Sequence, residues 1–83
     1  MKVRVKKSTD TIVSKLEGVG IDDNSVCIFI RWYNENFIPV SDVDKLEYLC
    51  NGKWKEIELW ENEDTPRKPE EIYNELEKLF LKG

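Results

Sequence analysis

Two pairs of closely spaced carboxylates are the residues in this sequence that could most directly do chemistry. Asp22 and Asp23 are adjacent, and Asp42 and Asp44 are separated by one residue. On a loop or at a strand end, such pairs can bind a cation or act as general acid and base. Aspartate also stabilises turns, because its side chain accepts hydrogen bonds from the nearby backbone. We favour turn formation at both pairs.

Nucleophilic catalysis and metal binding have few candidate residues. The chain has no histidine, and its two cysteines, Cys27 and Cys50, lie in predicted strands and outside any C-x-x-C pair. A structural zinc site takes four Cys or His ligands, and no base is spaced to activate a Ser or Cys nucleophile. A disulfide is not expected in an intracellular chain, so both cysteines are predicted to be small buried hydrophobic residues. The segment GVG at 18–20 lacks the third glycine of a dinucleotide-binding loop. We expect no enzymatic activity, no cofactor and no metal site.

Aromatic side chains beside acids are stronger candidates for recognition. Trp54 and Trp60 fall on one face of a predicted hairpin, where they alternate with charged residues. The nearby carboxylates belong to Glu56, Glu58 and Glu61. Exposed indole rings bordered by carboxylates suit a basic surface of another protein. We therefore expect a non-catalytic interaction module, a small acidic accessory or regulatory protein. The sequence does not specify its oligomeric state.

A second candidate site contains Arg31, Tyr33 and Phe37. These residues fall on the face of a predicted strand opposite the core residue Trp32. An arginine beside two aromatic rings could stack on single-stranded bases or hold a methylated lysine or another small ligand. In that case the basic residues of the segment KVRVK at 2–6 would contact phosphate. We favour the alternative that the C-terminal helix covers this face, because its apolar stripe must be buried against the sheet.

Length and charge limit the class of protein. The chain has 83 residues, of which 40% are hydrophobic and 36% charged, as is typical of one globular domain. The net charge is −4, and between Glu56 and Glu77 nine acids stand against only Arg67 and Lys68. This balance argues against nucleic-acid binding, which needs clustered Lys and Arg. No apolar stretch approaches the ~20 residues of a membrane span, and MKVRVKK lacks the apolar core of a signal peptide. We expect a cytoplasmic protein that does not associate with membranes.

The N-terminal third predicts strands joined by loops. Alternation over residues 2–7 predicts a half-buried strand, and its outward lysines are typical of a protected sheet edge. Residues 11–17 fit either a short helix capped by Asp10 or a strand, and three consecutive β-branched residues favour the strand. Residues 18–25 are rich in Gly, Asp and Asn and predict a loop.

The segment VCIFIRWY at 26–33 predicts a central strand, because its first half is apolar on both faces. A three-residue loop at 34–36, with Asn36 in the left-handed conformation, would return the chain as a hairpin. In that register Ile30 lies opposite Val40. The predicted core face contains Ile28, Ile30, Trp32, Ile38 and Val40.

The C-terminal half predicts one hairpin and one helix. Asn51-Gly52 predicts a type I′ turn between strands at 45–50 and 53–60, with Leu49 opposite Trp54. One face of this hairpin carries Leu46, Tyr48, Ile57 and Leu59, which we expect to be buried. A linker at 61–68 leads to a helix over 69–82 with Pro69 in its first turn. Its apolar stripe consists of Ile72, Leu76, Leu79 and Phe80.

This order of elements predicts a single α+β domain over residues 1–83, with the sheet at about 2–60. About five strands would form a meandering antiparallel sheet or a partly closed barrel, with the C-terminal helix packed on it. The run RWYNENFIPVSDV at 31–43 resembles SH3-like and Tudor-like barrels, where such a hairpin ends in a short turn before the next strand. The resemblance implies a similar fold and carries no specific functional motif.

Overall fold

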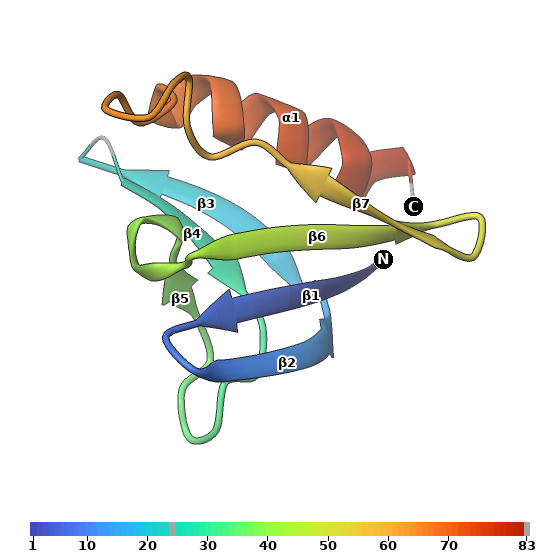
Figure 1. The fold of residues 1–83 in the computed structure, drawn as a ribbon. Helices are drawn as coiled ribbons and strands as arrows, with labels where there is room; N and C mark the ends of the chain where they lie inside the picture. The colour runs from blue at the N-terminus through green and yellow to red at the C-terminus, as the bar shows by residue number, and fades with distance from the viewer. Residues whose placement is uncertain (24, 83) are drawn as a thin grey trace.

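Two antiparallel sheets and one C-terminal helix make up the protein, as the computed structural model shows for residues 1–23 and 25–82 (Figure 1). The first sheet has the strand order β2-β1-β6-β7, and the second has the order β3-β4-β5. The elements are β1 (Lys2–Lys7), β2 (Asp10–Lys15), β3 (Gly18–Asp22), β4 (Ser25–Phe29), β5 (Ile38–Pro39), the short 3-10 helix η1 (Val40–Asp42), β6 (Lys45–Cys50), β7 (Lys53–Ile57) and α1 (Pro69–Lys82). The predicted α+β class with a helix packed on the sheet is confirmed, and the two sheets do not close into a barrel. In the described part of the chain, no helix has both the length and the apolarity that a membrane crossing requires.

The hairpin β6–β7 has the predicted turn and register. Asn51 and Gly52 have φ angles of 52° and 79°, the left-handed values that a type I′ turn needs at both central positions. Leu49 lies opposite Trp54 and Leu46 opposite Ile57, as predicted. Leu46 and Ile57 are fully buried, so this turn fixes which face of the hairpin enters the core.

The strand β1 has the predicted extent and buried face, but it is not an edge strand. It pairs with β2 on one side and with β6 on the other. The prediction of an edge was wrong because alternation reports which face is buried and says nothing about lateral neighbours. The strand β2 confirms the preferred reading of residues 11–17, although it begins at Asp10 and ends at Lys15.

The segment predicted as a loop at 18–25 contains the strand β3. Gly18 lies opposite Phe29 on β4, and Gly20 lies opposite Cys27. A Cβ atom on Gly20 would lie 3.3 Å from the Phe29 ring, and one on Gly18 would lie 3.5 Å from it. The loop prediction was wrong because both glycines pair with β4 in a strand, where Gly20 leaves room for the Phe29 ring and Gly18 lies at an ordinary contact distance from it.

The hairpin after β4 has the predicted core face but a different register. Ile28 lies opposite Ile38, four residues from the partner that the predicted register gives it. The chain turns earlier, where Trp32 and Glu35 exchange two backbone hydrogen bonds, and Tyr33, not Asn36, has a positive φ of 53°. An even slip preserves the faces of a strand. The predicted core residues Ile28, Ile30, Trp32, Ile38 and Val40 are all buried.

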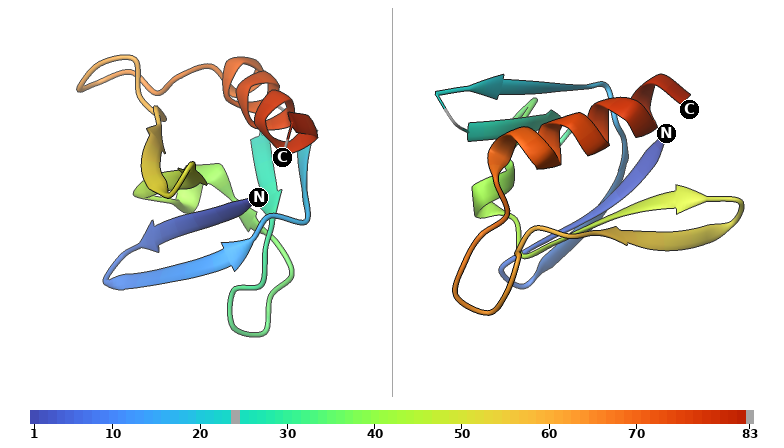
Figure 2. Two further views of the ribbon diagram at one scale, coloured as in Figure 1. Left: turned by 90° about the vertical axis from the view of Figure 1, so that its right-hand side faces the viewer. Right: turned by 90° about the horizontal axis from the view of Figure 1, so that it is seen from above.

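The helix α1 spans the predicted residues and docks through the predicted stripe. Ile72 and Leu76 are buried, and Leu79 and Phe80 pack half-buried against the same core. Figure 2 shows α1 running alongside β3 and β4, and Val26 and Ile28 of β4 belong to the same buried core as Ile72 and Leu76 of α1.

The prediction that α1 covers Tyr33 and Phe37 was wrong, because these rings are 65% and 49% exposed. Val26 and Ile28 continue one apolar core with the first sheet, and the helix completes that core. The opposite face of the second sheet is left without a covering helix.

Candidate functional site

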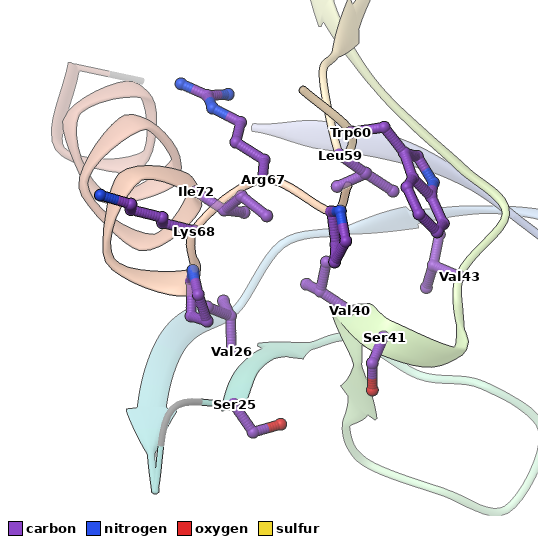
Figure 3. A pocket seen from close by; sticks show the side chains of 12 residues that line it. Ser25, Val26, Val40, Ser41, Val43, Leu59, Trp60, Arg67, Lys68 and Ile72 are labelled. Carbon is purple, nitrogen blue, oxygen red and sulfur yellow. The ribbon is translucent and has the colours of Figure 1, made fainter. Parts of the chain in front are cut away.

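An apolar pocket of about 490 Å³ lies where the chain between β7 and α1 passes over β4 and η1 (Figure 3). Its lining residues are Ser25, Val26, Val40, Ser41, Val43, Leu59, Trp60, Pro66, Arg67, Lys68, Pro69 and Ile72. In Figure 3 the Trp60 indole and Val43 lie on one side of the hollow, with Val26 and Ile72 on the other. Its volume lies within the range of pockets that bind small molecules or a partner's side chain. We call it the Trp60 pocket.

Trp60 is held at the rim by the backbone around it. It forms an isolated antiparallel bridge with Pro66, and the backbone N–H of Arg67 donates to the carbonyl oxygen of Leu59 at 2.9 Å. The indole remains 53% exposed, although the neighbouring Leu59 packs against the core. The bridge holds the backbone of a residue whose aromatic ring water still reaches.

The loop at 61–65 is closed by its own hydrogen bonds and presents acids beside the Trp60 pocket. The Oδ1 atom of Asn62 accepts backbone N–H groups from Asp64 and Thr65, both at 2.9 Å. The N–H of Glu61 donates to the carbonyl oxygen of Thr65 at 2.9 Å. The carboxylates of Glu61, Glu63 and Asp64 therefore project from an ordered turn into solvent.

The basic residues of the rim do not point into the pocket. Figure 3 shows the guanidinium of Arg67 and the ammonium of Lys68 extending away from the hollow. Arg67 donates to the carbonyl oxygen of Glu58 at 3.1 Å and pairs with the carboxylate of Glu75 at 2.8 Å. A second carboxylate, that of Glu71, lies 3.7 Å from its Nε atom. The charge of Arg67 is thus balanced by α1, and the interior of the pocket is apolar.

Trp54 lies elsewhere, so the predicted Trp54–Trp60 patch is divided between two places. The guanidinium of Arg4 lies 4.6 Å from the centroid of the half-buried Trp54 ring, on the solvent side of the first sheet. Arg4 also makes two hydrogen bonds to the Glu47 carboxylate, at 2.9 and 2.8 Å, which lower the pKa of Glu47. Glu56 is exposed and lies opposite Glu47 in the register. Of the predicted partner-binding residues, only Glu58, Trp60 and Glu61 lie together near the pocket.

The second predicted site, formed by Arg31, Tyr33 and Phe37, is exposed but is not one platform. The Tyr33 ring packs edge-on against Trp32, with centroids 5.7 Å apart. Phe37 instead approaches Phe29, with centroids 6.2 Å apart and a 50° tilt. Arg31 lines a separate hollow of about 480 Å³ together with Phe29. Sequence reasoning missed Phe29, and the signal for it was the pair of glycines on the neighbouring strand.

The carboxylate pairs lie at the end of a strand and in turns: Asp22 is the last residue of β3, and the other three follow strands or lie in η1 and the bend after it. Asp23 has a φ of 45° after β3, and Asp42 lies in η1. Asp44 accepts the backbone N–H of Ser8 at 2.8 Å. Over residues 1–23 and 25–82, no three His, Cys, Asp or Glu side chains are grouped to hold a metal ion.

The two cysteines have half-buried side chains in β4 and β6, and both carry free thiols. This burial is less complete than the sequence predicted.

Comparison with known proteins identifies no relative. No protein-family model matches the chain, and neither a curated protein nor a solved structure matches it.

Proposed function

We propose that this protein is a non-catalytic interaction module that takes an apolar side chain of a partner protein into the Trp60 pocket. The observation that carries the proposal is a half-exposed indole forming one wall of an apolar hollow, beside a turn whose charged residues are all acids. Tryptophan is enriched among the few residues that supply most of the binding energy at protein interfaces. Because the bridge to Pro66 already holds the backbone of Trp60, less backbone entropy is lost when the pocket is filled.

Charge specifies the kind of partner. Glu58, Glu61, Glu63 and Asp64 are exposed in the segment on either side of Trp60, whereas Arg67 is paired within the protein and the exposed Lys68 extends away from the hollow. An apolar side chain flanked by lysine or arginine would meet both features of this surface. Carboxylates at the rim would mainly raise the association rate and make it sensitive to salt.

A short synthetic peptide tests the proposal. The probe is a fluorescein-labelled peptide with one leucine flanked by two lysines on each side, and its controls replace the leucine with serine or the lysines with glutamates. We expect fluorescence polarisation to show that the lysine–leucine peptide binds the protein and that neither control peptide does. Trp60→Ser should weaken binding about 30-fold, as expected when an interface residue worth about 2 kcal/mol is lost.

Trp54→Phe serves as the matched control, because Trp54 lies under Arg4 and away from the pocket. It should leave the affinity unchanged, while added salt should reduce it. Equal affinity of the Trp60→Ser variant and the unmodified protein would contradict the proposal.

The alternative function, an SH3-like or Tudor-like platform for single-stranded nucleic acid or a small ligand at Arg31, Tyr33 and Phe37, stays a prediction. An oligonucleotide titration at low salt tests it. A cytoplasmic location is likewise a prediction from the sequence.

A further inference from the structure

The outward face of the second sheet is apolar and has no helix or strand over it in either view of Figure 2. Gly18 and Gly20 of β3 lie on this face opposite Phe29 and Cys27 of β4. Pro39 of β5 lies opposite Cys27 on its other side, and the Phe37 ring approaches that of Phe29. Along β4, Val26 and Ile28 are buried, whereas Phe29 is 41% exposed. Sheets normally bury an apolar face against a second layer. We call this surface the Phe29 face.

Formal charges lie only at the two ends of the Phe29 face. Asp22 marks one end, where it lies opposite Ser25. Arg31 marks the other end, two residues beyond Phe29, and the exposed Glu17 lines the same hollow as these two residues. The side chains of Asp22 and Arg31 are exposed, and among the described residues neither forms an ion pair. The centre of this face carries no formal charge. It therefore would not attract a basic partner, in contrast to the acids near the Trp60 pocket.

We propose that the Phe29 face binds the same face of a second copy of this chain. If the two-fold axis lies between the two faces and perpendicular to the strands, the strands of the two copies run in opposite directions. Arg31 of each copy then lies near Asp22 of the other. If the axis lies parallel to the strands, Arg31 of one copy lies over Arg31 of the other, and the repulsion between like charges disfavours this arrangement. The face is therefore complementary to itself in one orientation: apolar centre on apolar centre, and opposite charges at both ends.

Its dimensions set the strength of the dimer. Three strands about 4.8 Å apart and five residues rising about 3.3 Å each give a contact of roughly 14 Å by 17 Å. A stable interface buries about 800 Å² on each partner, which is well above this estimate. The dimer is thus weak and dissociates on dilution. The rings of Phe29 and Phe37 supply most of its apolar contact.

Sedimentation velocity from about 10 µM to about 1 mM, the range expected for a small interface, tests the dimer. The unmodified protein should pass from monomer to dimer over this range, and ¹H–¹⁵N spectra should shift with concentration at Phe29, Phe37 and their neighbours. Phe37→Ser should abolish dimerisation. Val13→Ser is the matched control, since Val13 is 51% exposed on β2 in the other sheet and should have no effect.

Charge reversal tests the orientation without touching the fold. Arg31→Asp and Asp22→Arg alone should each weaken the dimer about tenfold, because two ion pairs become two like-charge contacts. An equimolar mixture of the two variants should dimerise as the unmodified protein does, because the mixed dimer keeps one original Arg31–Asp22 pair and regains the other pair with its charges exchanged. Trp60→Ser should leave the dimer unchanged, which separates this result from the test of the pocket.

Three results would overturn the proposal. They are a monomer throughout the concentration range, a mixture that dimerises no better than its components, and oligonucleotide-dependent shifts at Phe29 and Phe37 in place of concentration-dependent ones.

Discussion

Replacing Leu76 with alanine should remove much of the free energy that holds α1 on the sheets. Leu76 is fully buried at the centre of the helix stripe. Leu→Ala substitutions in a core cost about 2–5 kcal/mol, while a chain of this length has a total free energy of unfolding of roughly 4–12 kcal/mol. A loss of about 3 kcal/mol would lower Tm by about 12–24 °C, since each kcal/mol shifts a small domain by about 4–8 °C.

The same helix supplies the control. Leu81 is 75% exposed and lies five residues further along α1. Leu81→Ala makes the identical chemical change, and we expect it to alter stability by less than about 0.5 kcal/mol. Urea unfolding followed by circular dichroism, together with thermal melts, measures both variants. Equal losses for the two substitutions would refute docking of the helix through Leu76.

Two further predictions concern the first sheet and its hairpin. Hydrogen bonds from Arg4 lower the pKa of Glu47 from its ordinary 4.5, so the pair's contribution to stability is present above that value and is lost as pH falls through the lowered pKa. Glu47→Gln should flatten this part of the stability profile in urea unfolding across acidic pH, and an unchanged profile would contradict the assignment. Gly52→Ala should lower the free energy of unfolding by about 1–2 kcal/mol, because Gly52 has a φ of 79°, which an alanine rarely adopts. An added Cβ would meet no atom within 4 Å, so the loss comes from backbone conformation and not from a steric clash. Thermal melts should show a much smaller loss for Gly18→Ala, whose Cβ would make an ordinary 3.5 Å contact with Phe29.

Elements specified by neighbouring residues could be predicted from the sequence. Asn51-Gly52 requires the left-handed conformation at two successive positions, so turn, register and buried face of β6–β7 follow together. The stripe of α1 repeats at the helical period after Pro69, and this fixes both the start of the helix and the side that it buries. In each case a few adjacent side chains determine the result.

Elements that depend on distant residues could not be predicted in this way. Gly18 and Gly20 favour a loop when they are considered alone, yet both pair with β4, and the Phe29 ring of that strand occupies the space beside Gly20. The hairpin after β4 turns at Tyr33, a residue that rarely adopts a positive φ, so turn propensity gave the wrong register. The buried face was still correct because alternation does not depend on the turn.

The number of acids between Glu56 and Glu77 overstates the negative charge that is available to a partner at the Trp60 pocket. The strand β7 ends at Ile57, three residues before the predicted end at residue 60. The chain then leaves the sheet, and Trp60 lines the pocket. In Figure 3 Trp60 and Val43 lie on one side of the hollow and Ile72 on the other.

Some acids of this region serve the fold. Glu71 and Glu75 hold Arg67, and that pairing keeps the guanidinium out of the hollow. The carboxylates of Glu61, Glu63 and Asp64 have no such internal cation among the described residues. The attraction that we propose for a basic partner would therefore arise mainly from the turn before the helix, next to the Trp60 indole that solvent reaches at the pocket. The exposed indole and the unpaired acids of the proposed binding surface thus lie on the same segment of chain.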